Sequence, residues 1–295
     1  MIARLDGLLE CVLFVAGLAF GSFLNVCISR IPDDESVVRP RSHCRSCGAL
    51  ISWRDNIPLL SWIVLRGRCR RCGAPISLRY PTVELLTALL FVACYLSFGW
   101  TVLTLKFCVF GFLQLGLIFM DAETGLLPRE FTYSGIGLGL IFSWLVATDD
   151  SGTVLLLRAY GKPVPNMHWL SLMDSLLGGL IGAGFFFLAW ALYYLARHKH
   201  GLGFGDIALM AMSGTFLGAK LVVLVIFCAP LLGVIYAIIL LVREKLKPAS
   251  EAQTKPHGET PFLSREMPFG VFLGACSLGA VFAGQAIWHW YLRMP

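Results

Sequence analysis

The stretch Val102–Met120, VLTLKFCVFGFLQLGLIFM, decides the fold class of this chain. It carries one charged residue, Lys106, and is about as long as the roughly 20 residues that a helix needs to cross a bilayer. The whole chain has this character, because 57% of its 295 residues are hydrophobic, only 14% are charged and the mean hydropathy is +0.74. Soluble domains are roughly 45–50% apolar and about 25% charged. The composition excludes a disordered chain, a collagen-like chain and an ordinary soluble enzyme, and it predicts a polytopic membrane protein.

Eight stretches of this kind are long enough, or nearly long enough, to span a membrane. They are Leu8–Ile28, Val83–Phe98, Val102–Met120, Phe131–Ala147, Leu170–Ala196, Ile207–Leu217, Leu221–Val242 and Val271–Tyr291. The sixth is short for a full span. The first has no basic start and no small-residue cleavage site, so we interpret it as a retained helix rather than a signal peptide. The chain is thus predicted to be all-α, with about eight transmembrane helices.

Lysine and arginine residues indicate on which side of the membrane each loop lies. They concentrate between the first two spans, in Arg197–His200 and in Arg243–Arg265. Basic loops stay in the cytoplasm, so these segments are predicted to be cytoplasmic, with both termini and the Thr148–Trp169 loop outside. Five tryptophans then fall near the outer interface, where indole rings prefer to lie: Trp100, Trp144, Trp169, Trp288 and Trp290. The same bias accounts for the net charge of +6 without a nucleic-acid partner.

The first cytoplasmic loop carries two similar cysteine pairs, Cys44-Arg-Ser-Cys47 and Cys69-Arg-Arg-Cys72, each followed by glycine. This spacing is typical of a four-thiolate zinc site, and four thiolates leave no open position for catalysis. We expect the neighbouring arginines to favour the thiolate form and the metal to stabilise a loop too small for a good core. Two disulfides are the alternative, disfavoured in a reducing cytoplasm. A nucleic-acid-binding ribbon is disfavoured by the nearby membrane.

Three units are therefore expected: a first transmembrane helix (1–29), a cytoplasmic zinc-binding loop domain (30–81) and a core of seven helices (82–295). Two interpretations stay open for the apolar stretch Ile57–Leu65. It lies on the bilayer surface with Arg66 and Arg68 reaching the head groups, or it forms the loop's own core. The remaining cysteines are expected to be small buried hydrophobes: Cys11, Cys27, Cys94, Cys108, Cys228 and Cys276.

Two aspartates lie at the predicted cytoplasmic ends of their spans. Asp121 ends the third span in DAETGLLP, and Asp206 begins the sixth in GLGFGD. Because both aspartates lie at the same depth in the membrane, they can face each other. A carboxylate pair that shares one proton is suited to aspartyl hydrolysis. Gly201, Gly203 and Gly205 leave backbone open for an extended peptide, and Gly203 and Gly205 are the candidate substrate contacts. Polar helix ends, or an ion relay in a transporter, remain the alternatives.

Two glutamates accompany these motifs. Glu123 follows Asp121 closely and is expected to be solvated or to support it. Glu84 begins the second span and is expected to pair with a basic residue of the zinc loop.

The ordered set of motifs resembles the type IV prepilin leader peptidases over nearly the whole chain. The matching segments are Gly21–Val26 (GSFLNV), Arg39–Cys44 (RPRSHC), Ile51–Pro58 (ISWRDNIP), Leu65–Cys69 (LRGRC), Arg79–Glu84 (RYPTVE), the Asp121 motif, Gly203–Asp206 (GFGD) and Pro268–Gly270 (PFG). The resemblance implies cleavage of the basic leader of prepilins and pseudopilins after a glycine, at the cytoplasmic face of a bacterial inner membrane. It implies that Asp121 and Asp206 are the catalytic pair and that Cys44, Cys47, Cys69 and Cys72 bind zinc.

The resemblance also implies that the new N-terminus is methylated with S-adenosylmethionine. The sequence has no glycine-rich nucleotide loop, so the zinc loop and the membrane edge are the expected donor region. Three features depart from the family: Ala208 replaces a usual lysine, Val271 replaces a usual proline, and the Thr148–Trp169 loop is long. The alternative functions are an ion-coupled transporter using Asp121 and Asp206 as a relay, and a membrane scaffold.

Overall fold

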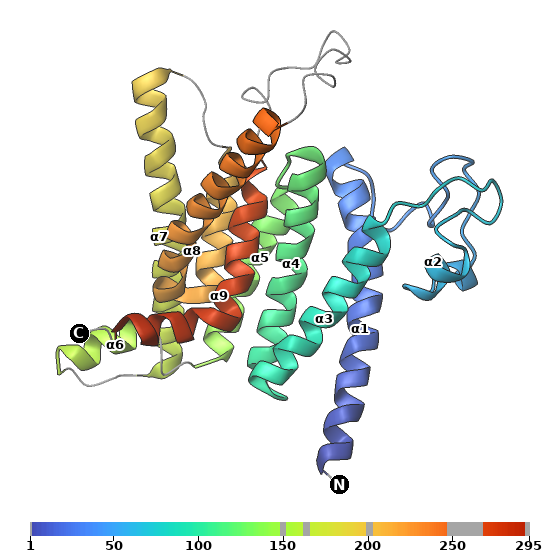
Figure 1. Cartoon of the computed structure of the whole chain (residues 1–295). Helices are drawn as coiled ribbons and strands as arrows, with labels where there is room; N and C mark the ends of the chain where they lie inside the picture. Colours follow the sequence, from blue (N-terminus) through green and yellow to red (C-terminus); the bar gives the residue numbers. More distant parts are fainter. Residues whose placement is uncertain (1, 148–151, 162–165, 199–202, 247–267, 293–295) are drawn as a thin grey trace.

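The computed structural model describes residues 2–147, 152–161, 166–198, 203–246 and 268–292 (Figure 1). The long helices are α1 (Ile2–Arg30), α3 (Arg79–Phe98), α4 (Val102–Thr124), α5 (Arg129–Leu145), α7 (Met167–Arg197), α8 (Phe204–Leu246) and α9 (Phe269–Leu292). The short ones are α2 (Leu60–Val64), α6 (Gly152–Ala159) and the 3-10 turns η1 (Ile31–Asp33) and η2 (Trp53–Asn56). Within the described ranges there are only isolated β-bridges, so the predicted all-α fold is confirmed.

In the described part of the chain, six helices are long and apolar enough to cross a membrane, namely α1, α3, α4, α7, α8 and α9. Helix α5, with 17 residues, corresponds to the predicted span Phe131–Ala147. Helix α8 holds two predicted spans, because its backbone leaves the helical conformation at Gly218 (φ 79°, ψ 174°). These elements account for the eight predicted stretches.

The two halves of α8 form a helical hairpin on α7 and α9. In the first half, Gly214 lies so close to Gly178 of α7 that an added Cβ would be 2.1 Å from the Gly178 carbonyl oxygen. In the second half, Lys220 donates to Gln285 near the end of α9 at 2.7 Å, whereas Tyr236 contacts Phe272 near its start. The first half, Phe204–Leu217, is about 21 Å long at 1.5 Å per residue, shorter than a hydrocarbon core of about 30 Å.

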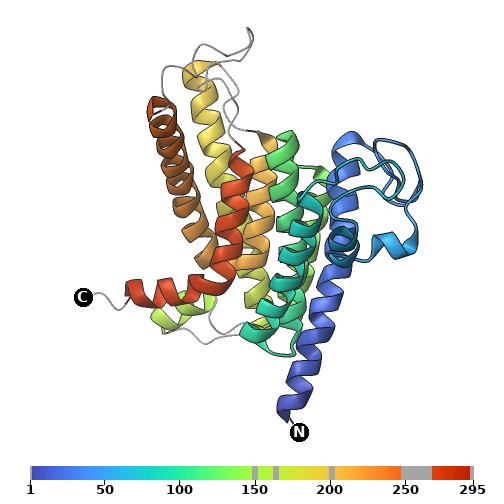
Figure 2. The ribbon, with the colours of Figure 1, turned by 45° about the vertical axis from the view of Figure 1, so that its right-hand side comes forward.

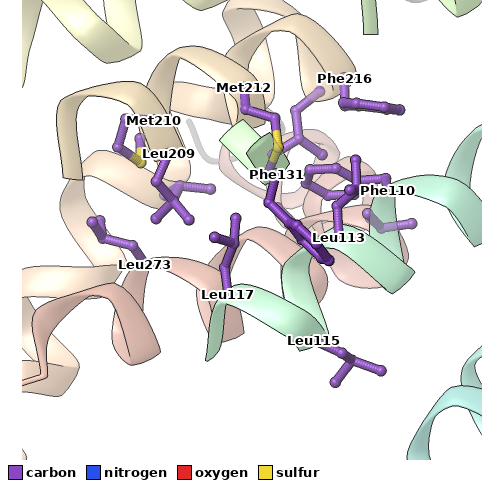
Figure 3. Close-up of a cluster of buried hydrophobic side chains, with 14 of the residues drawn as sticks. Phe110, Leu113, Leu115, Leu117, Phe131, Leu209, Met210, Met212, Phe216 and Leu273 are labelled. Atoms are coloured by element: carbon purple, nitrogen blue, oxygen red, sulfur yellow. The ribbon is translucent and has the colours of Figure 1, made fainter. Parts of the chain in front are cut away.

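Helix α4 lies at the centre of the core. Of its most apolar segment 61% is buried, against 28–39% for the other five candidate spans. Figure 3 shows the core side chains gathered from α4, α5, α8 and α9: Phe110, Leu113, Leu117, Phe131, Leu209, Met212, Phe216 and Leu273. The rings of Phe110 and Phe216 stack with centroids 4.8 Å apart. This packing joins α4 to the first half of α8, the two elements that carry the candidate aspartates.

Helices α1 and α3 pack closely and hold residues 31–78, which we call the insert. An added Cβ at Gly21 would lie 2.6 Å from the Glu84 Cα, and Asn25 donates to the Tyr80 carbonyl oxygen at 2.9 Å. The motif Gly21–Val26 therefore serves helix packing. At the end of α1, the buried Arg30 donates to the carbonyl oxygens of Ser36 and Pro40 and directs the chain into the insert.

Figures 1 and 2 show which elements share an end of the bundle. The insert, the end of α4 and the start of α9 lie at one end, and the start of α1, the end of α9 and α6 lie at the other. At this second end the rings of Trp144 and Trp169 pack 4.9 Å apart. Several predictions fall outside the described residues: Gly201, residues 199–200 and 247–265 of the basic segments, and 148–151 and 162–165 of the outer loop.

The cysteines outside the insert follow the prediction only in part. Cys27, Cys94 and Cys108 are buried as expected, but Cys11 and Cys228 are exposed. The prediction was wrong for these two because the outer surface of a spanning helix faces lipid, where a small apolar side chain is as well accommodated as in the core.

Candidate active site and metal site

Asp121 lies in the last turn of α4, where the first turn of α9 meets it. Its side chain is 6% exposed, and its Oδ2 accepts a hydrogen bond from the Val271 backbone N–H at 3.0 Å. The Gly270 N–H also donates to this carboxylate. The first N–H groups of a helix have no partner within the helix and carry partial positive charge. The start of α9 is therefore a clamp that fixes the position of the Asp121 carboxylate.

The close approach at this clamp requires glycine. A Cβ added to Gly270 would lie 2.9 Å from Asp121 Oδ2 and 3.2 Å from Leu127 Cδ1. The sequence marked Pro268–Gly270 only as a family segment, and its contact with Asp121 appears only in the structure. The departure at Val271 also has a consequence, because proline would have no N–H to donate to Asp121.

Asp206 lies in the first turn of α8 and is half-buried. Its backbone N–H donates to the Gly203 carbonyl oxygen at 3.2 Å, and its carboxylate accepts from the Gly203 N–H. The Asp121 and Asp206 carboxylates lie close enough for their like charges to repel each other. Leu127 borders Gly205 as well as Gly270, since a Cβ on Gly205 would lie 2.8 Å from the Leu127 Cβ. The fold thus brings together two carboxylates that lie far apart in the sequence.

The two candidate substrate glycines differ in their surroundings. Gly203 is exposed, and a Cβ there would meet only the Asp206 carboxylate and the Gly205 backbone, at 3.7 Å or more. Gly205 is half-buried against Leu127. Close packing against Leu127 is thus a sufficient reason for glycine at position 205, whereas Gly203 leaves its backbone open beside Asp206.

A second charged cluster ties three helices together near Asp121. Arg79, at the start of α3, forms an ion pair with Glu123 and donates to the Ser29 hydroxyl of α1 at 2.6 Å. Glu123 therefore supports the end of α4. Glu84 does not pair with a basic residue as expected. It accepts the Leu59 backbone N–H at 2.8 Å instead, because the insert brings the start of α2 directly over it.

The four insert cysteines form one cluster. Their sulfur atoms all lie within 4.8 Å of one another, and Cys44 Sγ is 3.8 Å from Cys72 Sγ. Zinc at about 2.3 Å from four tetrahedral sulfurs would place the sulfurs about 3.8 Å apart, so the cluster fits this metal. The two cysteine pairs form two turns of the same kind. The backbone N–H of Gly48 donates to the Cys44 carbonyl oxygen in the first turn, and that of Gly73 donates to the Cys69 carbonyl oxygen in the second, with φ of 69° and 72° at the two glycines.

Backbone N–H groups lower the pKa of two of these four thiols. The N–H groups of Cys47 and Ser46 lower the pKa of the Cys44 thiol to about 6. The N–H groups of Cys72 and Arg71 likewise lower the pKa of the Cys69 thiol. The expectation that arginine charges have this effect was wrong, because the turn aims backbone N–H groups at the sulfurs. Arg70 instead forms a paired hydrogen bond with Asp55 at 2.7–3.0 Å, which joins η2 to the second turn.

The chain matches two family models. One, described as the bacterial peptidase A24 N-terminal domain, matches residues 15–98, and the other, described as the type IV leader peptidase family, matches residues 108–238. The first match contains the insert, and the second contains both aspartates. No solved structure is significantly similar to the chain.

Curated relatives named prepilin leader peptidase/N-methyltransferase match most of the chain. The relative from Myxococcus xanthus is 37% identical over 259 residues, which cover 87% of this chain and 71% of the relative. Those from Aeromonas hydrophila and Neisseria gonorrhoeae are both 34% identical over 95% of this chain, covering 93% and 94% of their own lengths. These matches give no support to a transporter. The chain therefore belongs to the type IV leader peptidase family.

Proposed function

We propose that this protein cleaves the leader peptide from prepilins and pseudopilins with Asp121 and Asp206, and then methylates the new N-terminus. The observation that carries the proposal is the meeting of these two carboxylates around Leu127, which packs against Gly205 beside Asp206 and against Gly270 beside Asp121. It is supported by relatives whose names state both activities. The substrate is a membrane-embedded prepilin, and the reaction takes place where its leader leaves the bilayer.

In this mechanism the two aspartates share one proton. The ionised carboxylate takes a proton from a water molecule while the water oxygen attacks the scissile carbonyl carbon. The protonated carboxyl donates a hydrogen bond to the oxygen of that carbonyl. The C–N bond then breaks as the leaving amine takes up a proton. The protonation states belong to the pair. The clamp at Gly270 and Val271 fixes one member, and the exposed Gly203 backbone is placed to pair with the substrate beside the other.

Two cofactors belong to the proposal. Cys44, Cys47, Cys69 and Cys72 would hold a structural zinc ion that crosslinks the insert. S-adenosylmethionine would supply the methyl group for the new amine. We assign the donor to the insert and the adjoining membrane edge, where a cavity of about 250 Å³ is lined by Arg30, Arg41, Trp53 and Asn56 among others.

The protein is a multi-pass inner-membrane protein, and we propose that the aspartates and the insert face the cytoplasm. The arginines of the insert support this orientation by the positive-inside rule. The starts of α1 and α6 and the end of α9, at the opposite end of the bundle, then face the periplasm.

Mass spectrometry of a prepilin incubated with the purified protein and S-adenosylmethionine tests the proposal. We expect loss of the leader and a gain of about 14 Da on the mature product. Asp121→Asn and Asp206→Asn should each slow cleavage by at least about 100-fold, because an amide cannot take up or share the proton. Glu130→Gln, an exposed carboxyl at the start of α5, is the matched control and should cleave normally.

The outcomes separate the two activities. Normal cleavage by either asparagine variant would disprove the aspartyl mechanism. Cleavage by the wild type without the added mass would retain the peptidase and remove the methyltransferase.

A further inference from the structure

Helix α2 of the insert has an inner side and an outer side. Trp62 points inward, where its Nε1 donates to the Ile76 carbonyl oxygen at 3.2 Å and its ring lies against Gly67. Leu60, Ile63 and Val64 point outward and are 60%, 62% and 73% exposed. We call these three side chains the α2 face. The insert's own core therefore accounts for Trp62 and leaves the α2 face unexplained.

The depth of the α2 face follows from a hydrogen bond to a transmembrane helix. The N–H of Leu59, next to α2, donates to Glu84 Oε2 at 2.8 Å. Glu84 is the sixth residue of α3, so its Cα lies about 7.5 Å along the helix from the start at 1.5 Å per residue. Interfacial helices bury their apolar face about 5–10 Å into the boundary between head groups and acyl chains. Counted from Arg79, where the candidate membrane span begins, the start of α2 therefore lies at the depth of such a helix.

The surroundings of the α2 face have the character of a membrane surface. Leu85, Leu86 and Leu89 follow Glu84 on α3 and are 40%, 40% and 51% exposed, so an apolar outer surface continues along the bundle. Arg66 and Arg68 follow α2 and are exposed, which suits anionic head groups. In Figure 1, α2 lies at the margin of the insert that points along the bundle toward the start of α1.

We propose that the α2 face inserts into the lipid leaflet at the aspartates' end of the bundle and attaches the insert to the membrane surface. A protein partner fits less well, because a stable protein interface buries about 800 Å² per partner and a five-residue helix cannot provide this area. Lipid needs no such area, and three apolar side chains flanked by arginines are sufficient to contribute to interfacial binding. The insert is then held by α1, by α3 and by the bilayer.

Photocrosslinking tests the occupant of the α2 face. The full-length protein would carry benzoylphenylalanine at Ile63 and be reconstituted into vesicles of phosphatidylethanolamine and phosphatidylglycerol. Leu50, 61% exposed in the first cysteine turn, is the matched control position. On irradiation we expect lipid adducts at position 63 at several times the yield at position 50. Unchanged metal content and prepilin cleavage would show that both variants fold.

Other outcomes would overturn the proposal. Equal lipid yields at the two positions would mean that the α2 face lies outside the bilayer. Adducts mainly with a second copy of the chain, or with added prepilin, would assign the face to a protein partner.

A charge on the α2 face provides a second measurement. Ile63→Glu should speed hydrogen exchange in residues 57–65 several-fold in vesicles, because a carboxylate disfavours insertion into lipid. Leu50→Glu is the control and should leave this segment unchanged. If both substitutions changed the hydrogen exchange of residues 57–65 in vesicles by the same small amount, membrane attachment would be contradicted.

Discussion

At the scale of single residues, backbone groups determine the geometry of the candidate dyad. The Asp121 carboxylate accepts N–H groups from Gly270 and Val271, and Asp206 accepts the N–H of Gly203. Backbone donors at a helix start hardly move, so they hold a carboxylate more rigidly than long side chains do. Small residues at these positions are therefore part of the site although they carry no reactive group.

Gly270→Ala tests the clamp on Asp121. The new methyl group would lie 2.9 Å from Asp121 Oδ2, so the carboxylate must move away. A displacement of about 1 Å can cost roughly 100-fold in rate, and we expect a decrease of this order in the cleavage rate constant. Single-turnover cleavage of a prepilin measures it. Gly279→Ala on the same helix, where a Cβ would meet nothing within 4 Å, should cleave normally. Equal rates for both variants would mean that α9 does not position Asp121.

At the scale of elements, the insert consists of two similar cysteine turns joined by few other contacts. Each turn is closed locally, with backbone hydrogen bonds of 2.8–2.9 Å from Gly48 and Gly73 to the carbonyl oxygens of Cys44 and Cys69. Trp62 on Gly67 and the Asp55–Arg70 pair add a small core and one ion pair. A crosslink between the turns is therefore the main source of order that the insert's residues offer.

Metal analysis tests this view of the insert. We expect about one zinc ion per chain in protein purified without chelator, as a four-thiolate site requires. Cys69→Ser should lower this content well below one, whereas Cys11→Ser, at an exposed cysteine of α1, should not. Removing the metal should speed hydrogen exchange in residues 43–50 and 68–75 and leave the transmembrane helices unchanged. Metal-free protein whose insert is still protected from hydrogen exchange would contradict the prediction.

At the scale of the whole molecule, a helical hairpin brings the two aspartates together. Helix α8 reverses direction at Gly218, and Asp174 of α7 accepts backbone N–H groups from Ala219 after the turn and from Gly152 and Thr153 of α6. The reversal lets the short first half of α8 return to the end of the bundle where α4 ends. The position of Asp206 thus depends on a turn near the opposite end of the bundle.

Gly218→Ala tests this dependence. The conformation at φ 79° and ψ 174° is nearly restricted to glycine, and an added Cβ would lie 2.1 Å from Asp174 Oδ2. We expect the free energy of unfolding to fall by about 1–3 kcal/mol from backbone strain alone. Thermal unfolding in detergent, with cleavage assayed in parallel, measures the effect. Gly184→Ala on α7, where a Cβ has open space, should be neutral. Unchanged melting of the Gly218 variant would rule out a tight turn.

The orientation of the bundle is tested by topology reporters in living bacteria. Alkaline phosphatase, which is active only in the periplasm, should be active when fused after Trp100 and inactive when fused after Gly125. These positions lie at opposite ends of α4, so the pair reports one crossing. The reverse pattern would place the aspartates and the insert on the periplasmic side.

Hydropathy, motif order and cysteine spacing determined much of the molecule from the sequence alone. The eight apolar stretches, the cysteine cluster and the family could be predicted because each is recognised from short local patterns in the sequence. The short stretch Ile207–Leu217 was also recognised as an apolar segment. In the structure it forms most of the first half of the α8 hairpin.

Only the tertiary structure decided which distant groups meet. It placed the Val271 N–H on Asp121, 150 residues away, the Leu59 N–H on Glu84, and Arg79 between Ser29 and Glu123. It also showed that Trp62 points inward while its neighbours point outward. These contacts depend on how helices pack, and packing is a property of surfaces assembled from separate segments. A local pattern specifies each helix, but it does not specify which backbone N–H will face a carboxylate on another helix.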